Sequence, residues 1–456
     1  MRPFALPVAL FLGACVPVTP SDTPTRNFNA VQTSSLPPMK TFGAPRPTPP
    51  RKSNNDIAVD FIELSFQLES GRELPVLTRF EGPISVRVTG APPASLGPDL
   101  ARLLKRIRTE AKVDISRVPA SQNANITIQA VPRSAIRSAL PHAACFVVPN
   151  ISDINEYKTA RRTPKTNWSG LRVRKELGIF LPNDASPQEV RDCLHEELAQ
   201  ALGPLNDLYR LPDSVFNDDN VHTVLTGFDM LILRTFYDPS LRSGMTRGQL
   251  AAAMPGILAR INPGGEGLKG QFASRTPREW SQAIQTALGP GTSPKKRRRA
   301  AEKALEIART LGWTDHRRAF AHYAHGRVLL SASPAKAHEQ FIQADRFYAV
   351  TGGTDLHRAY VATQLAAHAI TEGDGQAALL LIGPHLQRAA RNENAALLST
   401  LMLLRAEALD IAGRENEARD LRLDSIGWAR YGFGPDWAVR AKMREIQSLN
   451  PLNGRG

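Results

Sequence analysis

The residues with the clearest chemical potential lie in one stretch, residues 192–207. Five of them have the spacing of the zinc-binding pattern H-E-x-x-H-x-x-G-x-x-H: Glu196, Glu197, Gln200, Gly203 and Asn206. In that pattern two histidines one helical turn apart bind zinc, and the glutamate between them activates water. Glu197 occupies the position of that glutamate, but the histidine positions hold Glu196, Gln200 and Asn206. The sequence therefore predicts the frame of a zinc site without its ligands, with Glu197 as the candidate base.

His195 allows a second alignment of the same pattern, with His195 and Glu196 as the opening pair. The second ligand position then falls on Ala199, which has no donor atom, and the glycine no longer matches. We therefore prefer the first alignment and place His195 beside the site.

Oxygen donors replace the imidazoles in the preferred alignment, and Asp207 can add one carboxylate. Such a set suits a hard cation or no metal, because zinc prefers imidazole and thiolate ligands. We therefore expect no metal and no cofactor. Bound zinc or another divalent cation is the alternative.

Two arrangements would give catalysis without zinc. Glu196 and Glu197 could act as paired acid and base, but neighbours on a helix point about 100° apart. His222 could act as a base oriented by Asp218 or Asp219, but the sequence places no serine or cysteine beside it as a nucleophile. These residues are therefore candidate neighbours of the site.

A helix over residues 187–203 must position these side chains. Four apolar residues recur in it at helical spacing: Leu194, Leu198, Ala201 and Leu202. Ser186 predicts an N-cap, Pro187 the first helical position and Glu189 a reciprocating capping glutamate. Gly203, followed by a proline, ends the helix.

The surrounding sequence resembles two related families. Residues 213–217 resemble the turn beneath the metal of metzincin peptidases, with Phe216 in place of the methionine. Residues 190–245 resemble a bacterial lipoprotein family, domain of unknown function 2927, through four motifs: Glu196-Glu197-x-x-Gln200-x-Leu202-Gly203, Ser214-Val215-Phe216-Asn217-Asp218-Asp219, His222-Thr223-Val224-Leu225-Thr226 and Tyr237-Asp238-Pro239. The resemblance implies a fold related to zinc peptidases and no established activity. It extends over residues 60–260 and does not include the last third.

The flanking residues predict an α+β domain over residues 57–265, a metzincin-like mixed twisted sheet with two long helices. Strand-like segments are found at residues 61–66, 84–88, 126–128, 145–148 and 178–181. Helical periodicity is found at residues 98–112, 226–237 and 247–260.

The last third predicts an all-α domain of helical hairpins over residues 295–450, joined to the first domain by a connector, residues 266–294. Two sets of residues resemble the small-large-small spacing of a tetratricopeptide-type (TPR-like) repeat: Ala337, Phe341 and Ala344, and, more loosely, Ala304, Ala308 and Leu311. Such repeats usually hold protein partners, and the alternative is a helical support for the first domain.

The N-terminus predicts export and lipid attachment. Residues 1–14 form a short signal peptide, and Leu12-Gly13-Ala14-Cys15 fits a lipobox in which Cys15 carries the lipid. The alternative is an ordinary secretory signal cut near Ala14. Residues 15–56 are rich in Pro, Ser, Thr and Asn and predict a disordered tether. We expect a periplasmic protein anchored to a membrane, with the residues after Cys15 favouring the outer membrane.

Charge and cysteine content agree with export. The formal charge of +14 on 456 residues favours contact with anionic lipid, cell-wall polymer or lipopolysaccharide, and does not choose among them. No nucleic-acid-binding module is visible, so nucleic acid is not an expected partner. With Cys15 assigned to lipid, Cys145 and Cys193 remain as a pair that would fasten the central helix to the sheet. The alternative is two buried thiols.

Two basic segments could contact anions. Residues 158–175 carry several cations around Trp168, and residues 295–299 are five consecutive Lys and Arg residues that open a helix. A solvated hairpin is the favoured interpretation of the first segment. A solvated first helical turn is favoured for the second, where the helix dipole disfavours positive charge.

These features predict an exported, lipid-anchored envelope protein. Its degenerate metallopeptidase-like domain is expected to bind or assemble protein or cell-wall partners, with the helical repeats as the part that binds protein. A hydrolase that uses Glu197 as general base at a non-standard metal site is the alternative.

Overall fold

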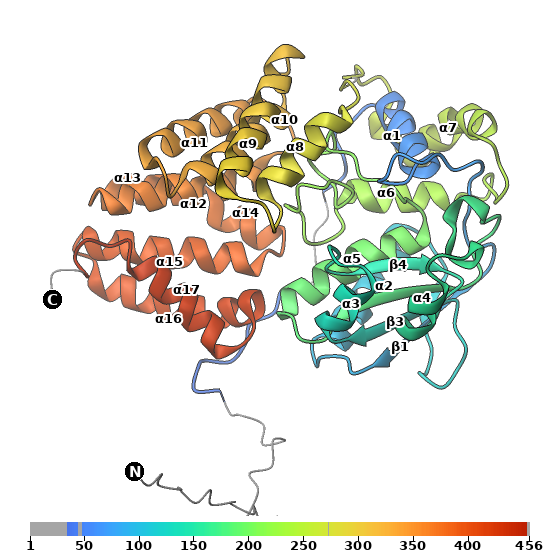
Figure 1. Cartoon of the computed structure of the whole chain (residues 1–456), viewed down its shortest axis with the longest axis horizontal. Coiled ribbons are helices and arrows are strands. Elements are labelled where there is room, and N and C mark those ends of the chain that lie inside the picture. The colour runs from blue at the N-terminus through green and yellow to red at the C-terminus, as the bar shows by residue number, and fades with distance from the viewer. Residues whose placement is uncertain (1–33, 44–47, 272, 454–456) are drawn as a thin grey trace, which may run out of the picture. The chain divides into compact units, whose positions relative to one another are not determined.

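The computed structural model describes residues 34–43, 48–271 and 273–453. The expected signal peptide and lipobox, including Cys15, lie outside these residues. The chain divides into two units, residues 1–35 and 36–456, and the second unit contains every helix and strand that the structure describes. Figure 1 shows the sheet and its helices in the first half of this unit and a large helical part in the second half.

A mixed sheet forms the centre of the first half. Its strands are β1 (Ile84–Gly90), β2 (Ile115–Arg117), β3 (Ile126–Val131), β4 (Phe146–Pro149) and β5 (Leu177–Pro182). They lie in the order β2-β1-β3-β5-β4, and all pairs are parallel except β4 with β5. The strands predicted at residues 84–88, 126–128, 145–148 and 178–181 are confirmed as β1, β3, β4 and β5.

Helices surround this sheet. The α-helices are α1 (Asn54–Phe66), α2 (Leu96–Glu110), α3 (Arg133–Ala139), α4 (Ile154–Ala160), α5 (Pro187–Leu202), α6 (Gly227–Phe236) and α7 (Arg247–Ile261), and the short 3₁₀ helices are η1 (Pro164–Thr166), η2 (Trp168–Gly170) and η3 (Pro263–Gly265). The predicted helices correspond to α2, α5, α6 and α7. The hydrophobic periodicity of the sequence therefore predicted the helices around the motif correctly.

The prediction of a strand at residues 61–66 is wrong, because these residues belong to α1. Ile57, Phe61 and Leu64 are all buried, and their spacing gives one apolar face of a helix. Ser53 caps this helix by accepting a hydrogen bond from the backbone N–H of Asp56 (3.1 Å). The helical period that begins upstream outweighs the strand-like composition of the last six residues.

β5 is covered on both faces, because successive side chains of a strand point in opposite directions. Ile179 packs in the main core with Leu100 of α2 and Leu194 of α5. Phe180 packs in a smaller core with Ile136 of α3. The helix that carries the degenerate motif thus lies on the main-core face of the sheet.

The second half is built from helices that pack mainly against their neighbours in sequence. They are α8 (Arg278–Leu288), α9 (Pro294–Thr310), α10 (His316–Leu329), α11 (Pro334–Ala349), α12 (Asp355–Thr371), α13 (Gly375–Ile382), η4 (Gly383–His385), α14 (Leu386–Arg391), α15 (Ala395–Ile411), α16 (Glu415–Phe433) and α17 (Asp436–Gln447). This α+β part followed by an all-α part agrees with the predicted fold class. None of the described helices is both long and apolar enough to cross a membrane.

The segment predicted to be a linker or helical connector, residues 266–294, contains a helix. This helix is α8, and its Trp280 is fully buried among residues of α9 and α10. Arg297, in the basic run, donates to the carbonyls of Leu288 (2.8 Å) and Gly289 (3.1 Å) at the end of α8. One cation of the basic run therefore caps the C-terminus of α8 through hydrogen bonds.

Part of the segment expected to be a tether is packed against the fold. The backbone N–H of Lys40 donates to the carbonyl of Gly427 in α16 (3.0 Å), and Phe42 stacks on Trp428 at 4.5 Å between ring centroids. Arg102 of α2 donates to the carbonyl of Phe42 (2.6 Å). Residues 36–43 thus contact both halves of the unit, and α1 starts within the expected tether as well.

Candidate functional site

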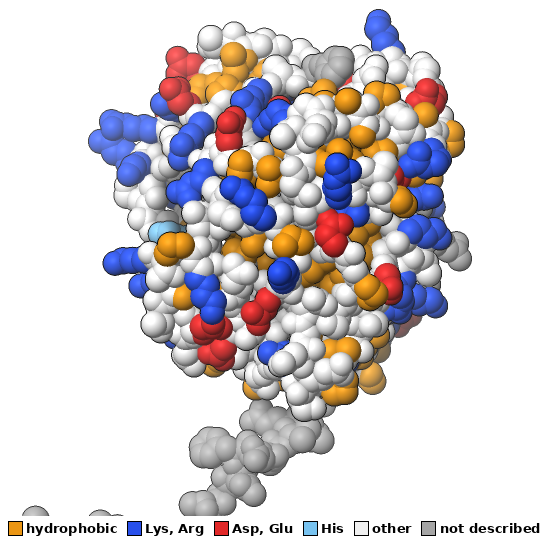
Figure 2. Space-filling model, turned by 90° about the vertical axis from the view of Figure 1, so that its right-hand side faces the viewer, with side chains coloured by type: hydrophobic (Ala, Val, Ile, Leu, Met, Phe, Trp, Pro, Cys, Tyr) orange, Lys and Arg blue, Asp and Glu red, His pale blue; other side chains and the backbone are white. Residues whose placement is uncertain are grey.

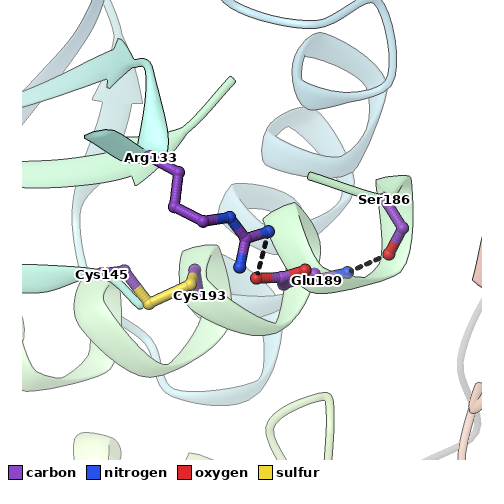
Figure 3. The surroundings of a disulfide bond; sticks show 5 residues. All are labelled: Arg133, Cys145, Ser186, Glu189 and Cys193. Atoms are coloured by element: carbon purple, nitrogen blue, oxygen red, sulfur yellow. Dashed lines mark hydrogen bonds and ion pairs between the residues drawn. A yellow bond between two sulfur atoms is a disulfide. The ribbon is translucent and has the colours of Figure 1, made fainter. Parts of the chain in front are cut away.

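The start of α5 is fixed by a cap, an ion pair and a disulfide (Figure 3). Ser186 Oγ accepts a hydrogen bond from the N–H of Glu189 (3.2 Å), as the sequence predicted. The Glu189 carboxylate, expected to complete a capping box, pairs instead with Arg133 of α3 (2.8 Å). The disulfide predicted between Cys145 and Cys193 is present and joins α5 to the residue before β4. The helix is thereby fastened to the edge of the sheet.

The end of α5 is fixed by Gly203 and Arg174. A Cβ atom at position 203 would lie 2.7 Å from the ring of Phe236, so no other residue fits without displacement. The guanidinium of Arg174 donates to the carbonyls of Gln200 (2.6 Å), Ala201 (2.7 Å) and Gly203 (2.5 Å). These carbonyls would otherwise be left unpaired at the helix end. Burial lowers the pKa of Arg174 to about 10, so the guanidinium keeps its charge at neutral pH.

Two of the three residues at histidine positions of the motif are held by partners outside α5. Asn206 Nδ2 donates to the carbonyl of Glu63 in α1 (3.2 Å). Gln200 Nε2 lies 3.5 Å from Glu69 Oε1, in the turn that follows α1. The third residue, Glu196, faces a group of carboxylates.

Four carboxyl groups from separate parts of the chain converge here, and we call them the acidic cluster: Glu69, Glu196, Asp207 and Asp218. Burial, with the charges of Glu69 and Asp218, raises the pKa of Glu196 to about 7. Burial and the charges of Glu69 and Glu196 raise the pKa of Asp207 well above its usual range, and its side chain is hydrogen-bonded to Glu69. At neutral pH the cluster therefore holds fewer negative charges than carboxyl groups.

The cluster also has partners in the rest of the fold. Burial and the charge of Asp218 raise the pKa of Glu69, although that side chain reaches solvent. Asp218 Oδ2 accepts a hydrogen bond from Gln285 Nε2 of α8 (3.2 Å). The Tyr209 hydroxyl is also hydrogen-bonded to Asp218. The helical part thus contributes directly to the surroundings of the acidic cluster.

Glu197, the candidate base, is a buried residue next to the acidic cluster. Its side chain is 4% exposed, and Oε2 has no hydrogen-bond partner in the described structure. Burial, followed by the charges of Glu196 and Glu69, raises the pKa of Glu197 well above its usual range. Burial thus favours the protonated form of Glu197, and a protonated carboxyl cannot accept a proton.

The histidines near the motif have structural hydrogen bonds. His195 Nδ1 accepts a hydrogen bond from the N–H of Leu225 (3.0 Å), and burial and neighbouring arginines lower its pKa, so its ring is neutral. His222 Nε2 bonds to the carbonyl of Pro212 (3.0 Å). Asp219 pairs with His357 of α12 (2.8 Å) rather than with His222. Sequence reasoning considered Asp218 or Asp219 as an orienter of His222, and in the structure the Asp219 carboxylate pairs with a histidine from the helical part.

The arrangement does not fit a metal centre. Among residues 34–43, 48–271 and 273–453, no group of three or more His, Cys, Asp or Glu side chains is placed to hold an ion together. The amide nitrogens of Asn206 and Gln200 face protein oxygens, the carbonyl of Glu63 and Glu69 Oε1, and the Asp207 side chain is hydrogen-bonded to Glu69. We therefore assign no metal-dependent step to these residues.

Residues 204–226 connect the cluster to the helical part. Phe216, at the position of the metzincin methionine, is fully buried in the main core. Tyr209 packs in a second core with residues of α8 to α12, and its ring lies 5.0 Å from that of Trp280. Val221 packs in a third core with residues of α12 to α15. The helices of the second half therefore pack against residues 204–226, which belong to the candidate site.

Buried charged groups reinforce this contact. Arg191 of α5 is 1% exposed and pairs with Glu393, before α15 (3.2 Å). The Tyr431 hydroxyl of α16 donates to Asp99 of α2 (2.7 Å). A buried charge that loses its partner is costly, so such pairs favour one specific packing of the two halves.

A cavity of about 300 Å³ lies along the same contact. Asp219 and His357 line it, together with aromatic side chains that include Phe320, Tyr323 and Tyr360. His357 Nδ1 is buried and has no hydrogen-bond partner in the described residues. The cavity and the acidic cluster are adjacent in sequence, because Asp218 belongs to the cluster and Asp219 lines the cavity.

The fold and site define an α+β domain with a degenerate motif, followed by an all-α region. Residues 54–256 match a family model whose description is Protein of unknown function (DUF2927). The chain therefore contains a DUF2927 domain, as the four motifs predicted, and the match ends within α7, before the helical part begins. No curated protein and no solved structure matches the chain.

Two residues that lie near the motif in the structure were not among the candidates from the sequence. Glu69 lies in a Ser-Gly turn far from the motif, and His357 lies in α12. No local spacing connects either residue to α5. Only the close packing of the turn and of α12 against residues 204–226 brings them to the site.

Proposed function

We propose that this protein is an exported, lipid-anchored envelope protein whose DUF2927 domain binds a cationic group of a protein or cell-wall partner in the acidic cluster. The supporting observation is the convergence of Glu69, Glu196, Asp207 and Asp218. Burial raises the pKa of all four, the charges of other cluster members add to this for the first three, and the charge of Asp219 adds to it for Asp218. A bound ammonium or guanidinium would replace the shared protons, because an opposite charge favours the ionised carboxylates. On this proposal the domain keeps a peptidase-like arrangement of elements and uses it to bind a ligand.

A metzincin-like origin is part of this proposal. It is supported by the order of the elements, a mixed sheet followed by a long helix with the remnant of the zinc pattern. Phe216 lies fully buried beneath that helix region, where the metzincin resemblance expects a methionine. The imidazoles that zinc prefers are replaced by the side chains of Glu196, Gln200 and Asn206.

We propose that the helical part mainly supports this site, and that protein partners contact its outer surface. Its buried side chains enclose Tyr209 and Val221, so these internal positions are already filled. We therefore favour a helical support for the first domain, which was the alternative noted from the sequence. We do not favour repeats that bind a partner on a concave surface.

Isothermal titration calorimetry of the full-length protein in detergent tests the cationic ligand. The probe is a purified cell-wall stem peptide with a free side-chain amine, compared with the same peptide after N-acetylation. We expect binding of the free amine only, with proton release that is visible as a different heat in two buffers of unlike ionisation enthalpy. Release follows because the bound cation lowers the raised pKa values of the cluster.

The variant Glu196→Gln/Asp207→Asn should abolish this binding, and Glu176→Gln, on an exposed residue outside the cluster, should retain it. Equal binding of free and acetylated peptides would contradict the proposal. So would unchanged affinity of the folded double variant.

Hydrolysis is the alternative function. It is favoured by one observation: Glu196, with a pKa of about 7, lies next to Asp207, whose pKa is raised because burial favours its protonated form. Mass spectrometry of the same peptides after incubation would detect cleavage. Products that disappear in Glu197→Gln would support the base predicted from the sequence, and products that disappear only in Glu196→Gln would assign the acid or base to the cluster.

The lipid anchor is tested separately. Cys15→Ser should move the protein from the membrane fraction to the soluble periplasmic fraction and abolish labelling by a radioactive fatty acid. A labelled protein in the Cys15→Ser variant would contradict lipid attachment at this residue.

A further inference from the structure

The basic loop, whose side chains are mostly exposed, also forms one wall of a cavity of about 480 Å³. The opposite residues belong to the turn at 68–72, and we call the cavity the basic pocket: Leu68, Arg72, Arg161, Arg162, Thr163, Pro164, Thr166, Asn167 and Trp168. None of these residues is acidic. The loop is ordered by the short helices η1 and η2, capped by the side chains of Thr163 and Asn167.

Positive charge in the basic pocket is largely uncompensated. In the described part of the chain, the guanidinium groups of Arg72 and Arg162 have no hydrogen-bond or carboxylate partner. Arg161 uses Nη1 to donate to the carbonyl of Ala139 (2.6 Å), which leaves its other N–H groups for a ligand. Figure 2 shows one face of the molecule with many Lys and Arg side chains, among which Asp and Glu side chains are interspersed. An anion would be attracted to this pocket.

Trp168 gives the basic pocket a fixed aromatic wall. The guanidinium of Arg174 lies 5.4 Å from the centroid of its ring, and Arg174 is itself held by the carbonyls at the end of α5. Trp168 also packs against the main core. A wall that is already ordered loses little entropy when a ligand packs on it.

From these observations we propose that the basic pocket binds a phosphorylated sugar. A phosphate monoester carries a charge of about −1.5 to −2 at neutral pH and accepts paired hydrogen bonds from arginine, so it matches several guanidinium groups better than a single carboxylate would. The apolar face of a sugar ring fits the indole of Trp168. Thr163, Thr166 and Asn167 supply polar atoms for its hydroxyl groups.

This proposal does not depend on the cationic ligand of the acidic cluster. The two sites are connected by the turn at 68–72, which carries Glu69 toward Gln200 and contributes Leu68 and Arg72 to the basic pocket. They are also connected by Arg174, which contacts both the Trp168 ring and the carbonyl of Gln200. Variants in one site therefore leave the ionisable groups of the other in place.

Calorimetric titration of the full-length protein with N-acetylglucosamine 1-phosphate tests the basic pocket. Inorganic phosphate, N-acetylglucosamine and adenosine monophosphate serve as the comparison ligands. We expect the sugar phosphate to bind more tightly than all three. Arg72→Ala/Arg162→Ala should weaken it roughly tenfold or more, because charge-assisted hydrogen bonds are lost.

Lys295→Ala/Arg299→Ala removes the same charge from an exposed surface and should leave the affinity unchanged. Trp168→Ala should weaken the sugar phosphate but not inorganic phosphate, and Trp168→Phe should restore part of the loss. Circular dichroism checks that each variant is folded. If both double variants weaken sugar-phosphate binding equally, the effect comes from net charge alone and the proposal is overturned. Tighter binding of adenosine monophosphate than of the sugar phosphate would also overturn it.

Discussion

Replacing Glu196 by glutamine should stabilise the protein at alkaline pH. Burial and nearby carboxylates raise the pKa of Glu196 from 4.5 to about 7 in the folded protein. The folded state therefore holds this proton more tightly than the unfolded state, and stability from this group is greatest below about pH 4.5 and lost as the pH rises through 7. The full difference corresponds to about 3 kcal/mol. Because Glu196 keeps some solvent contact, we expect Glu196→Gln to gain about 1–3 kcal/mol at pH 8.

Urea unfolding, followed by circular dichroism at pH 5 and pH 8, measures this gain. At pH 5 the folded protein keeps Glu196 protonated, so the variant and the natural protein should differ much less than at pH 8. Glu176→Gln, on an exposed residue, should change stability little at either pH. The reasoning is refuted if Glu196→Gln has the same effect at both pH values, or if it destabilises the protein at pH 8.

Three further changes test the framework of the site. Gly203→Ala should lower the free energy of unfolding by about 1–3 kcal/mol in urea titrations, because its Cβ meets an aromatic ring; Gly256→Ala, where α7 has open space, should be neutral or stabilising. Arg191→Met should cost about 3–5 kcal/mol because it leaves Glu393 buried without its partner, and a cost below 1 kcal/mol would contradict the buried pair. Reduction of the Cys193 disulfide should lower the thermal midpoint by removing about 2–4 kcal/mol, measured with and without reductant.

Local patterns predicted the elements that carry the site. The cap at Ser186 and the glycine at 203 set the limits of α5, and both are local signals that a sequence states directly. The strand predicted at residues 61–66 failed because six residues are too short to separate a strand from the end of a helix. A longer window that included Ile57 would have shown the helical period.

Long-range contacts explain most of what the sequence did not reveal. Glu189 was expected to cap its own helix, but Arg133 competes for the carboxylate from α3. The ion pair between Asp219 and His357 of α12 was not foreseen at all. Pairings of this kind depend on how separate elements pack, and residue spacing carries no information about them.

The packing of residues 36–43 has a consequence for folding during synthesis. These residues leave the ribosome hundreds of positions before Gly427 and Trp428, to which Lys40 and Phe42 bind. Their docking is a contact of very large sequence separation, which closes late because the entropy of a long loop must first be overcome. The beginning of the fold can therefore be secured only after almost the whole chain has been made.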